Sequence, residues 1–325
     1  ISLLILMTIL VSIFFKGERY LIFLGYIYVL GVSMTPNWFF QGIEKMHFIT
    51  FIDTISKVLV TILIFVIIKD KNHYIFYIPI LGIGSLISCL SGFILIKREY
   101  DINILMPSFN IIFGELVKGF PIFLAQISTY LFTNTNILLI GTFLGSFYAG
   151  IYSIAEKAAR IPWTFCSIFS TVLYPSICNQ TKIGLDSVWK LIKKYIYWFY
   201  SLVGLLITVV YILNYYIIEY FTKDNVVEIV YLFNLLLFST IFIAIGTPYN
   251  LILLAYSINR PYMKIFLRIA LINIILGTSL IYSFGIYGAG YSHLLTMIIL
   301  YILLRHTYSN TLKHEIEKVR ETFIL

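Results

Sequence analysis

A short polar and aromatic corner, set between two long apolar runs, reads Pro36-Asn37-Trp38-Phe39-Phe40-Gln41-Gly42-Ile43-Glu44-Lys45-Met46-His47-Phe48-Ile49-Thr50. Nearly everything on either side of it is hydrocarbon-like. Each crossing of a bilayer by a helix needs about 20 predominantly apolar residues, and each return needs a polar turn. The corner therefore predicts a protein that crosses a membrane several times.

The composition of the whole chain points the same way. Of its 325 residues, 60% are hydrophobic and 12% are charged, and the mean hydropathy is +0.93. A soluble domain is about 45–50% apolar and about 25% charged. A soluble chain this apolar would lack the polar surface that keeps a protein dissolved, so the bilayer is the expected solvent.

The net charge of +8 does not indicate nucleic acid, because the basic residues fall in loops between apolar runs and form no patch. Cys89, Cys166 and Cys178 all lie in apolar runs and are expected to be small buried hydrophobes. The five histidines are scattered without metal-ligand spacing. No Gly-rich nucleotide-binding loop is present, so ATP is not expected as the direct energy source.

The predicted spans are helical, because open sheet edges are not viable in lipid. We expect ten of them, at about 1–15, 20–40, 47–68, 74–96, 120–142, 148–178, 195–214, 227–256, 262–283 and 286–304. Pro162 and Pro248 should kink or interrupt the two longest runs. The apolar run begins at Ile1 without a signal-peptide n-region, so we expect the chain to start inside a transmembrane helix.

The distribution of Lys and Arg gives the orientation. Fifteen lie in one set of loops, around residues 45, 97–118, 182–194 and 260–268 and after 305, and five lie in the other set. The basic side is cytoplasmic, so the C-terminus and the corner are expected in the cytoplasm.

Four segments follow from the runs and the charges. Between the two groups of spans, Lys97-Arg98-Glu99 opens a connection whose amphipathic residues 111–117 predict a helix at the membrane interface. The expected segments are the remainder of an N-terminal helix bundle (1–96), a cytoplasmic amphipathic connection (97–119), a C-terminal helix bundle (120–304) and a cytoplasmic tail (305–325).

Three stretches carry a family resemblance. They read Trp38-Phe39-Phe40-Gln41-Gly42-Ile43-Glu44-Lys45, Gly141-Thr142-Phe143-Leu144-Gly145-Ser146-Phe147-Tyr148-Ala149-Gly150-Ile151-Tyr152-Ser153-Ile154-Ala155-Glu156-Lys157 and Leu173-Tyr174-Pro175. In these the chain resembles the Wzx-like bacterial flippases of O-antigen and capsule repeat units, in the superfamily that includes the MATE exporters. The resemblance implies an all-α integral membrane protein with twelve helices in two bundles, so that the helices missing from this chain lie at its start.

The resemblance also implies an activity. A flippase of this kind moves a polyprenyl-pyrophosphate-linked oligosaccharide across the bacterial cytoplasmic membrane, is not an enzyme, and is driven by coupled H⁺ or Na⁺ without another cofactor. Its implied partners are the lipid-linked oligosaccharide, the lipid bilayer and the polysaccharide polymerase machinery.

Charged residues within the apolar runs are candidates for the transport path, because each costs a few kcal/mol in the membrane. Asp53 and Lys57 are spaced i, i+4 and can pair; the pair either serves transport or only neutralises itself. Glu156 and Arg160 have the same spacing, and Lys157 adds a positive charge that either faces a cavity or sits at the outer membrane edge.

For the other polar residues in the apolar runs, a role in transport stands beside an ordinary structural role. Arg268 either lines the path or snorkels to the cytoplasmic surface. The 120–142 run contains three uncharged polar residues, Gln126, Asn134 and Asn136. They either join helices by hydrogen bonds or hydrogen-bond sugar hydroxyls. In an anion-transporting path, Lys157, Arg160 and Arg268 would attract the pyrophosphate.

Two other classes of function compete with the flippase. A MATE-like antiporter of cationic small molecules should have an acidic cavity, whereas the two charged clusters hold three bases, including Lys57, and two acids. A membrane-bound glycan polymerase or acyltransferase should carry a large outer loop or a catalytic His/Asp group, and the outer loops here are short.

Overall fold

The computed structural model describes residues 19–100, 108–221 and 226–324. Within these ranges every regular element is a helix, which confirms the all-α prediction. Eight of the described helices are long and apolar enough to cross a membrane. They correspond to the predicted runs from 47–68 onward, and the first predicted run, 1–15, lies outside the described residues.

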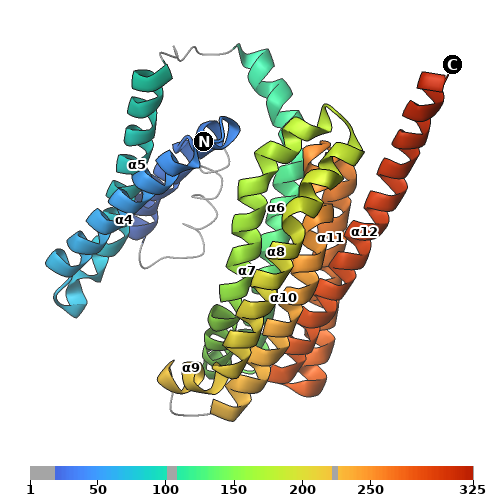
Figure 1. The fold of residues 1–325 in the computed structure, drawn as a ribbon. Coiled ribbons are helices and arrows are strands. Elements are labelled where there is room, and N and C mark those ends of the chain that lie inside the picture. The colour runs from blue at the N-terminus through green and yellow to red at the C-terminus, as the bar shows by residue number, and fades with distance from the viewer. Residues whose placement is uncertain (1–18, 101–107, 222–225, 325) are drawn as a thin grey trace. The chain divides into compact units, whose positions relative to one another are not determined.

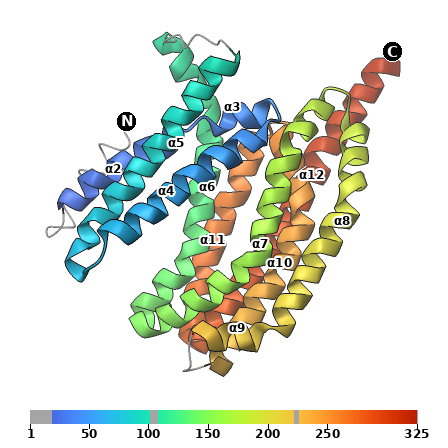
Figure 2. The same cartoon turned by 60° about the vertical axis from the view of Figure 1, so that its left-hand side comes forward.

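The chain divides into two compact units, which meet in sequence between Met106 and Pro107. In the first unit, α5 lies between α2 and α4 (Figure 2) and packs against both. Its elements are α2 (Arg19–Met34), α3 (Asn37–Gly42), α4 (Met46–Ile67), the 3₁₀ helix η1 (Lys71–Phe76) and α5 (Tyr77–Tyr100). The predicted 20–40 run is thus divided into α2 and α3 at Pro36, which has no N–H to continue the helix.

The corner at 36–50 is a packed turn. Gly42 ends α3, Glu44 takes a left-handed conformation with φ 59°, and the Lys45 N–H donates to the Phe40 carbonyl at 3.0 Å. The Phe40 ring is buried against Ile52 of α4 and Ile96 of α5. The aromatic residues of the corner therefore fix the turn to the two helices that follow it.

The second unit is a bundle of long helices (Figure 1). Going round it, α6 packs against α11, α11 against α12, α12 against α10, α10 against α7 and α7 against α6, so these five form a ring. Outside the ring, α8 packs on α7 and α10. The bounds are α6 (Phe109–Phe143), α7 (Ser146–Thr181), α8 (Leu185–Ile212), α9 (Asn214–Phe221), α10 (Val226–Ala255), α11 (Asn259–Phe284) and α12 (Ile286–Ile324).

Two turns of this ring depend on glycine. Gly145 precedes α7 with φ 95°, and Gly285 separates α11 from α12 with φ 59°. Side chains with a Cβ rarely adopt these conformations. Each glycine lets the chain reverse within two or three residues, which places α7 beside α6 and α12 beside α11.

Two expectations about helix ends differ from the structure. Pro162 and Pro248 do not interrupt the two longest runs, because α7 and α10 continue through them; a kink at either proline stays a prediction. The predicted connection 97–119 contains the end of α5 and the first turns of α6, which starts at Phe109 and is 35 residues long. At 1.5 Å per residue α6 spans about 50 Å, more than the roughly 30 Å hydrocarbon core, so part of it extends beyond the lipid tails. An interfacial position for residues 109–119 stays a prediction.

Candidate functional site

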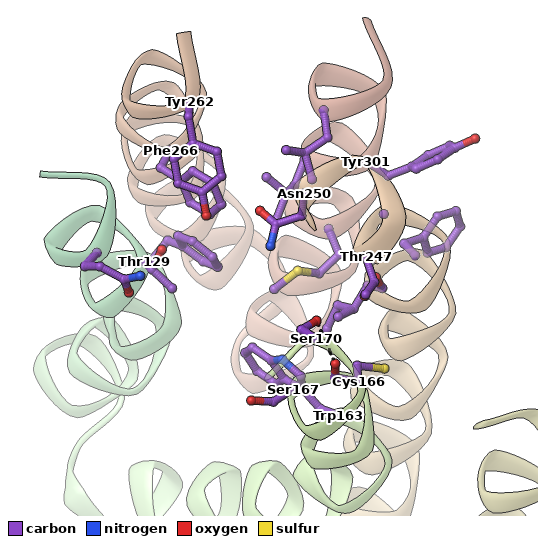
Figure 3. A pocket seen from close by; sticks show the side chains of 18 residues that line it. Thr129, Trp163, Cys166, Ser167, Ser170, Thr247, Asn250, Tyr262, Phe266 and Tyr301 are labelled. Atoms are coloured by element: carbon purple, nitrogen blue, oxygen red, sulfur yellow. Dashed lines mark hydrogen bonds between the residues drawn. The ribbon is translucent and has the colours of Figure 1, made fainter. Parts of the chain in front are cut away.

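A cavity of about 310 Å³ lies inside the five-helix ring of the second unit (Figure 3). Its wall combines aromatic rings with hydroxyl and amide groups, and none of the eighteen residues that line it is acidic or basic. The lining residues are Gln126, Thr129, Phe132, Trp163, Cys166, Ser167, Ser170, Phe242, Ile243, Gly246, Thr247, Asn250, Tyr262, Phe266, Met297, Leu300, Tyr301 and Leu304.

Helical periodicity explains which residues reach the cavity. On α7 the lining positions are 163, 166, 167 and 170, and on α12 they are 297, 300, 301 and 304. Both sets follow the i, i+3, i+4, i+7 pattern of one helix face. Each helix thus contributes a narrow stripe, and only the ring closure assembles the five stripes into a wall.

Three hydroxyl groups of the wall, on Thr129, Ser170 and Thr247, donate to carbonyls of their own helices. Thr129 donates to the Ala125 carbonyl at 2.9 Å, and Thr247 donates to the Ile243 carbonyl at 2.9 Å. This back-bonding satisfies the donor where no water is at hand, as is common for hydroxyl residues in apolar helices. The hydroxyl oxygens keep their lone pairs for a ligand.

Asn250 brings to the cavity wall a polar atom that lacks a hydrogen-bond donor. Its Oδ1 is buried and has no hydrogen-bond partner among the described residues. Figure 3 shows the amide reaching into the space between α11 and α10, with the Tyr262 and Phe266 rings opposite. A buried acceptor without a donor costs about 1–3 kcal/mol. A ligand that brings a hydroxyl or amide donor would recover that cost.

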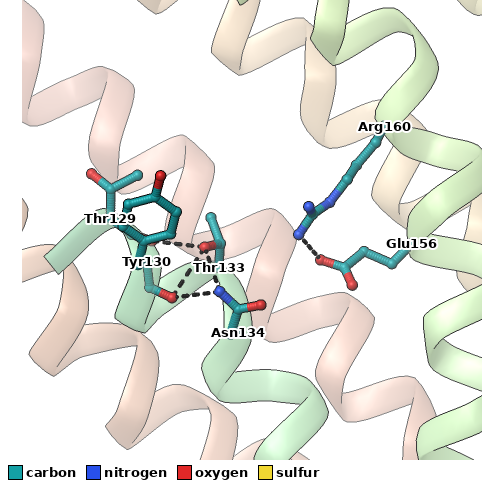
Figure 4. A network of polar contacts seen from close by, with 6 residues as sticks. All are labelled: Thr129, Tyr130, Thr133, Asn134, Glu156 and Arg160. Atoms are coloured by element: carbon teal, nitrogen blue, oxygen red, sulfur yellow. Dashed lines mark hydrogen bonds and ion pairs between the residues drawn. The ribbon is translucent and has the colours of Figure 1, made fainter. Parts of the chain in front are cut away.

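A second, much smaller cavity adjoins the first and contains the predicted ion pair. Arg160 Nη2 lies 2.7 Å from Glu156 Oε1 (Figure 4), and the Glu156 side chain is 12% exposed while that of Arg160 is 45% exposed. The buried His293 of α12 lines the same cavity, together with Ser239 and Thr240 of α10.

Trp163 belongs to both cavities. Its ring centroid lies 5.7 Å from the Arg160 guanidinium carbon and 6.3 Å from the centroid of the His293 ring. Glu156, Arg160, Trp163, Ser167 and Ser170 line one or other cavity and follow i, i+3 or i+4 spacing along α7. One continuous stripe of α7 therefore runs from the ion pair into the uncharged cavity.

The other predicted site residues of the second unit differ in whether they line a cavity. Gln126 lines the large cavity. Lys157 and Arg268 are exposed and line neither cavity. Asn134 is also exposed, and its Nδ2 donates to the Tyr130 carbonyl of its own helix at 2.8 Å (Figure 4). Of the predicted charges, Glu156 and Arg160 are thus the two beside the cavity.

Asn136 joins helices. It is fully buried, donates to the Ala289 carbonyl at 3.4 Å and accepts from Ser292 Oγ at 3.5 Å. The amide of Asn273 on α11 donates to Thr296 Oγ1 at 3.0 Å, and Thr296 donates to the Ser292 carbonyl at 2.7 Å. This network links α6, α11 and α12 without a charge, which is the packing role that polar residues have in membrane bundles.

Asp53 and Lys57 form the predicted pair in the first unit. Lys57 Nζ lies 3.8 Å from Asp53 Oδ2, and the two side chains are 80% and 36% exposed respectively. Beside them Ser56 is buried and donates to the Gly84 carbonyl, which brings α4 close to α5.

Sequence reasoning missed several functional candidates in the second unit. An aromatic residue and a single amide are ordinary in an apolar run, so the sequence gives no signal for Trp163 or Asn250. His293 is one of five scattered histidines without metal-ligand spacing. Asn273 could have been found by the criterion that selected Asn136, an amide within a span. Among the described residues, no group of three or more His, Cys, Asp or Glu could hold a metal ion.

Membrane-length helices and a polar cavity inside a helical bundle define a multi-pass membrane protein. The family model described as "Polysaccharide biosynthesis protein" matches residues 1–180, more than half of the sequence. The chain belongs to this polysaccharide biosynthesis protein family.

Two curated relatives have the same printed name, "Putative O-antigen transporter". The protein from Shigella dysenteriae is 30% identical over 130 residues, which is 40% of this chain and 32% of the relative. The protein from Escherichia coli (strain K12) is 22% identical over 273 residues, which is 82% of this chain and 65% of the relative. The chain thus spans less than two thirds of the length of either. No solved structure matches it.

Proposed function

We propose that this chain acts as a flippase that moves a polyprenyl-pyrophosphate-linked oligosaccharide repeat unit across the bacterial cytoplasmic membrane, for O-antigen or capsule synthesis. The observation that carries the proposal is the polar cavity inside a membrane bundle of a polysaccharide biosynthesis family member. The names of the two relatives support the same activity.

The physical task of a flippase is to replace the water around a polar head group. An unpaired hydroxyl or amide costs several kcal/mol in hydrocarbon, so a sugar needs hydrogen-bonding partners during the crossing. The cavity offers amides from Gln126 and Asn250 and hydroxyl oxygens from Thr129 and Thr247. The lipid tail needs no such partners and stays in the bilayer. No covalent bond is made or broken, so the protein is a transporter and not an enzyme.

The pyrophosphate needs a cation, and among the described residues Arg160 lines the small cavity next to the large one. In the structure its charge is engaged by Glu156. Binding of the coupling ion, H⁺ or Na⁺, at Glu156 would weaken this pairing and leave Arg160 to an anionic ligand; Asp53 is the other carboxylate that could take up the ion. Such an exchange would couple ion uptake to head-group binding, and alternating access of the two bundles would carry the cargo across. In this proposal the exposed side chains of Lys157, Arg268 and the Asp53–Lys57 pair would meet the head group outside the cavity.

The orientation proposed from the loop charges puts the C-terminus in the cytoplasm. Lipid-linked cargo would then enter from the cytoplasmic leaflet and leave for the polymerase machinery on the outer side. The partners in this proposal are the lipid-linked oligosaccharide, the bilayer and that machinery.

A flipping assay with the full-length protein in proteoliposomes tests the proposal. We expect Arg160→Gln to reduce transport at least tenfold, and Arg268→Gln, which changes an exposed arginine outside both cavities, to reduce it much less. Absence of transport by the full-length protein would refute the flippase. Unchanged transport by Arg160→Gln would remove Arg160 from the mechanism.

A MATE-like antiporter is the second candidate. A cationic drug held in a low-dielectric cavity needs a carboxylate to offset the loss of water around its charge. The large cavity offers no carboxylate, and the nearby Glu156 is already paired with Arg160. The observations therefore favour the oligosaccharide over a cationic drug.

A further inference from the structure

The large cavity differs in chemistry from the rest of the proposed transport path. The path must accept an anionic pyrophosphate, yet neither a base nor an acid is among the described residues that line the cavity. The neighbouring charges form an ion pair in a separate, smaller cavity. The two parts of a lipid-linked head group, sugar and phosphate, thus meet two different environments.

We propose that the large cavity is a carbohydrate subsite that holds one uncharged sugar residue of the cargo and excludes acidic sugars. The inference rests on the proposed flippase and deepens it by naming the chemical class of the residue that the second unit selects.

A charged sugar would be costly to bind in this cavity. A carboxylate moved from water into a cavity without a cation loses its solvation and gains no compensating partner. A uronic acid residue would bring such a carboxylate. Arg160 does not line the cavity, and its guanidinium is already bonded to Glu156.

The chemical groups of the cavity wall match those of a neutral sugar ring. A neutral sugar offers hydroxyl groups at its rim and C–H groups on its faces. Asn250 Oδ1 is a buried acceptor in need of a donor, and Gln126 supplies a second amide. Trp163, Tyr262 and Phe266 offer aromatic surface to the ring faces (Figure 3). An apolar wall with a few placed polar groups is typical of a small-molecule site.

The volume of the cavity suits a single sugar residue. The cavity, of about 310 Å³, lies at the lower end of the roughly 300–1,000 Å³ that is usual for small-molecule sites. It has room for a small part of the cargo and not for a whole repeat unit. The rest of the oligosaccharide must lie elsewhere along the path, so the cavity acts on one residue at a time.

A binding assay that needs no transport tests the subsite. The full-length protein in nanodiscs, with the exposed Trp38 and Trp198 replaced by Phe to lower the background, is titrated while tryptophan emission is recorded. The probes are glucose, galactose and N-acetylglucosamine, with glucuronate and galacturonate as acids that match the two hexoses in shape. Trp163 lies in the cavity wall and reports its occupation.

We expect at least one neutral sugar to give a saturable change in emission, and the acid of the same ring shape to bind at least tenfold more weakly. Asn250→Leu should weaken the neutral sugar at least tenfold. Asn110→Leu, which changes an exposed asparagine of α6 that lines neither cavity, should leave binding unchanged. Because Asn250→Leu could disturb folding, Asn250→Asp serves as a second variant of the same shape, and it should weaken the acidic sugar further.

Three results would overturn the subsite: no saturable change with any neutral sugar, equal binding of a hexose and its uronic acid, or full binding by a folded Asn250→Leu protein. The flippase itself is judged separately. Sugar binding without flipping would refute only the flippase, and flipping without sugar binding would refute only the subsite.

Discussion

Replacing Arg160 by Gln should destabilise the second unit by leaving the Glu156 carboxylate without its ion partner. The magnitude follows from where the pair lies. Breaking a fully buried pair costs about 3–5 kcal/mol, and an exposed pair contributes about 0–1 kcal/mol. The Glu156 side chain is 12% exposed and that of Arg160 is 45% exposed, so solvent screens one side of the pair. We therefore expect a loss of about 1–3 kcal/mol in the free energy of unfolding.

The double variant Glu156→Gln, Arg160→Gln separates charge from packing. With both charges gone, no carboxylate is left unpaired, and the two amides are close in size to the groups they replace. We expect the double variant to lose less than the single Arg160→Gln variant, since two neutral groups carry a smaller desolvation cost than one unpaired charge.

The pair Glu115–Lys118 on α6 is a matched control. Its N–O distance is also 2.7 Å, but its side chains are 67% and 74% exposed. Lys118→Gln should change stability by less than about 0.5 kcal/mol, as is usual for exposed pairs. Unfolding of all variants is followed by denaturant titration in the same mixed micelles. If Arg160→Gln is as stable as the parent, or if the double variant loses as much as the single one, the argument from the buried carboxylate is wrong.

Three further predictions concern the second unit and use the same measurement of the free energy of unfolding. Gly277→Ala should lower this free energy by about 1–3 kcal/mol, because the new Cβ would lie 2.8 Å from a leucine methyl and 3.0 Å from a buried amide oxygen, both on α6. Gly204→Ala is its control: the added Cβ meets nothing within 4 Å, so this variant should stabilise α8 by up to about 1 kcal/mol. Asn273→Leu should cost about 0.6–2 kcal/mol through its lost interhelical bonds, whereas an equal loss in the exposed Asn134→Leu would show that position does not matter. Gly145→Ala should cost about 1 kcal/mol because of its φ of 95°, and an unchanged stability would mean that the turn before α7 adapts freely.

The membrane spans could be predicted because hydropathy is a local property of the sequence. The eight spans from α4 onward each contain or overlap one predicted run. The start of α6 could not be placed in this way, because its first turns, near Glu115 and Lys118, are polar enough to suggest a loop. A helix continues past the lipid wherever its backbone bonds are satisfied, and hydropathy does not report that.

The prolines show a second limit of local reasoning. Pro162 and Pro248 each remove one backbone hydrogen bond, which predicts a break in an isolated helix. In a membrane bundle, the neighbouring helices and local adjustments satisfy the freed groups, so a helix tolerates proline. Pro162 is buried within the bundle, where its neighbours hold α7 together on both sides of it.

The Glu156–Arg160 pair could be predicted because i, i+4 spacing fixes the contact within one helix. The cavity could not, because its wall comes from five helices and each supplies only a few ordinary residues. Arg268 illustrates the difference: its charge within a run made it a candidate, but the face of α11 on which it lies is exposed and away from the cavity. Which face of a helix turns inward depends on the packing of the whole ring.

The stripe on α7 gives the two cavities a mechanical connection. From Glu156 to Ser170 it covers fourteen residue steps, about 21 Å along the helix axis at 1.5 Å each. Because α7 is one continuous helix over that length, we expect a rotation that alters the Glu156–Arg160 pair to turn Trp163 and Ser167 in the cavity wall as well. If the head group binds as proposed, the charge state of the pair and sugar binding must influence each other. Arg160→Gln should then change the affinity for a neutral sugar even though Arg160 does not line that cavity, and an unchanged affinity in the nanodisc titration would show that the two cavities work independently.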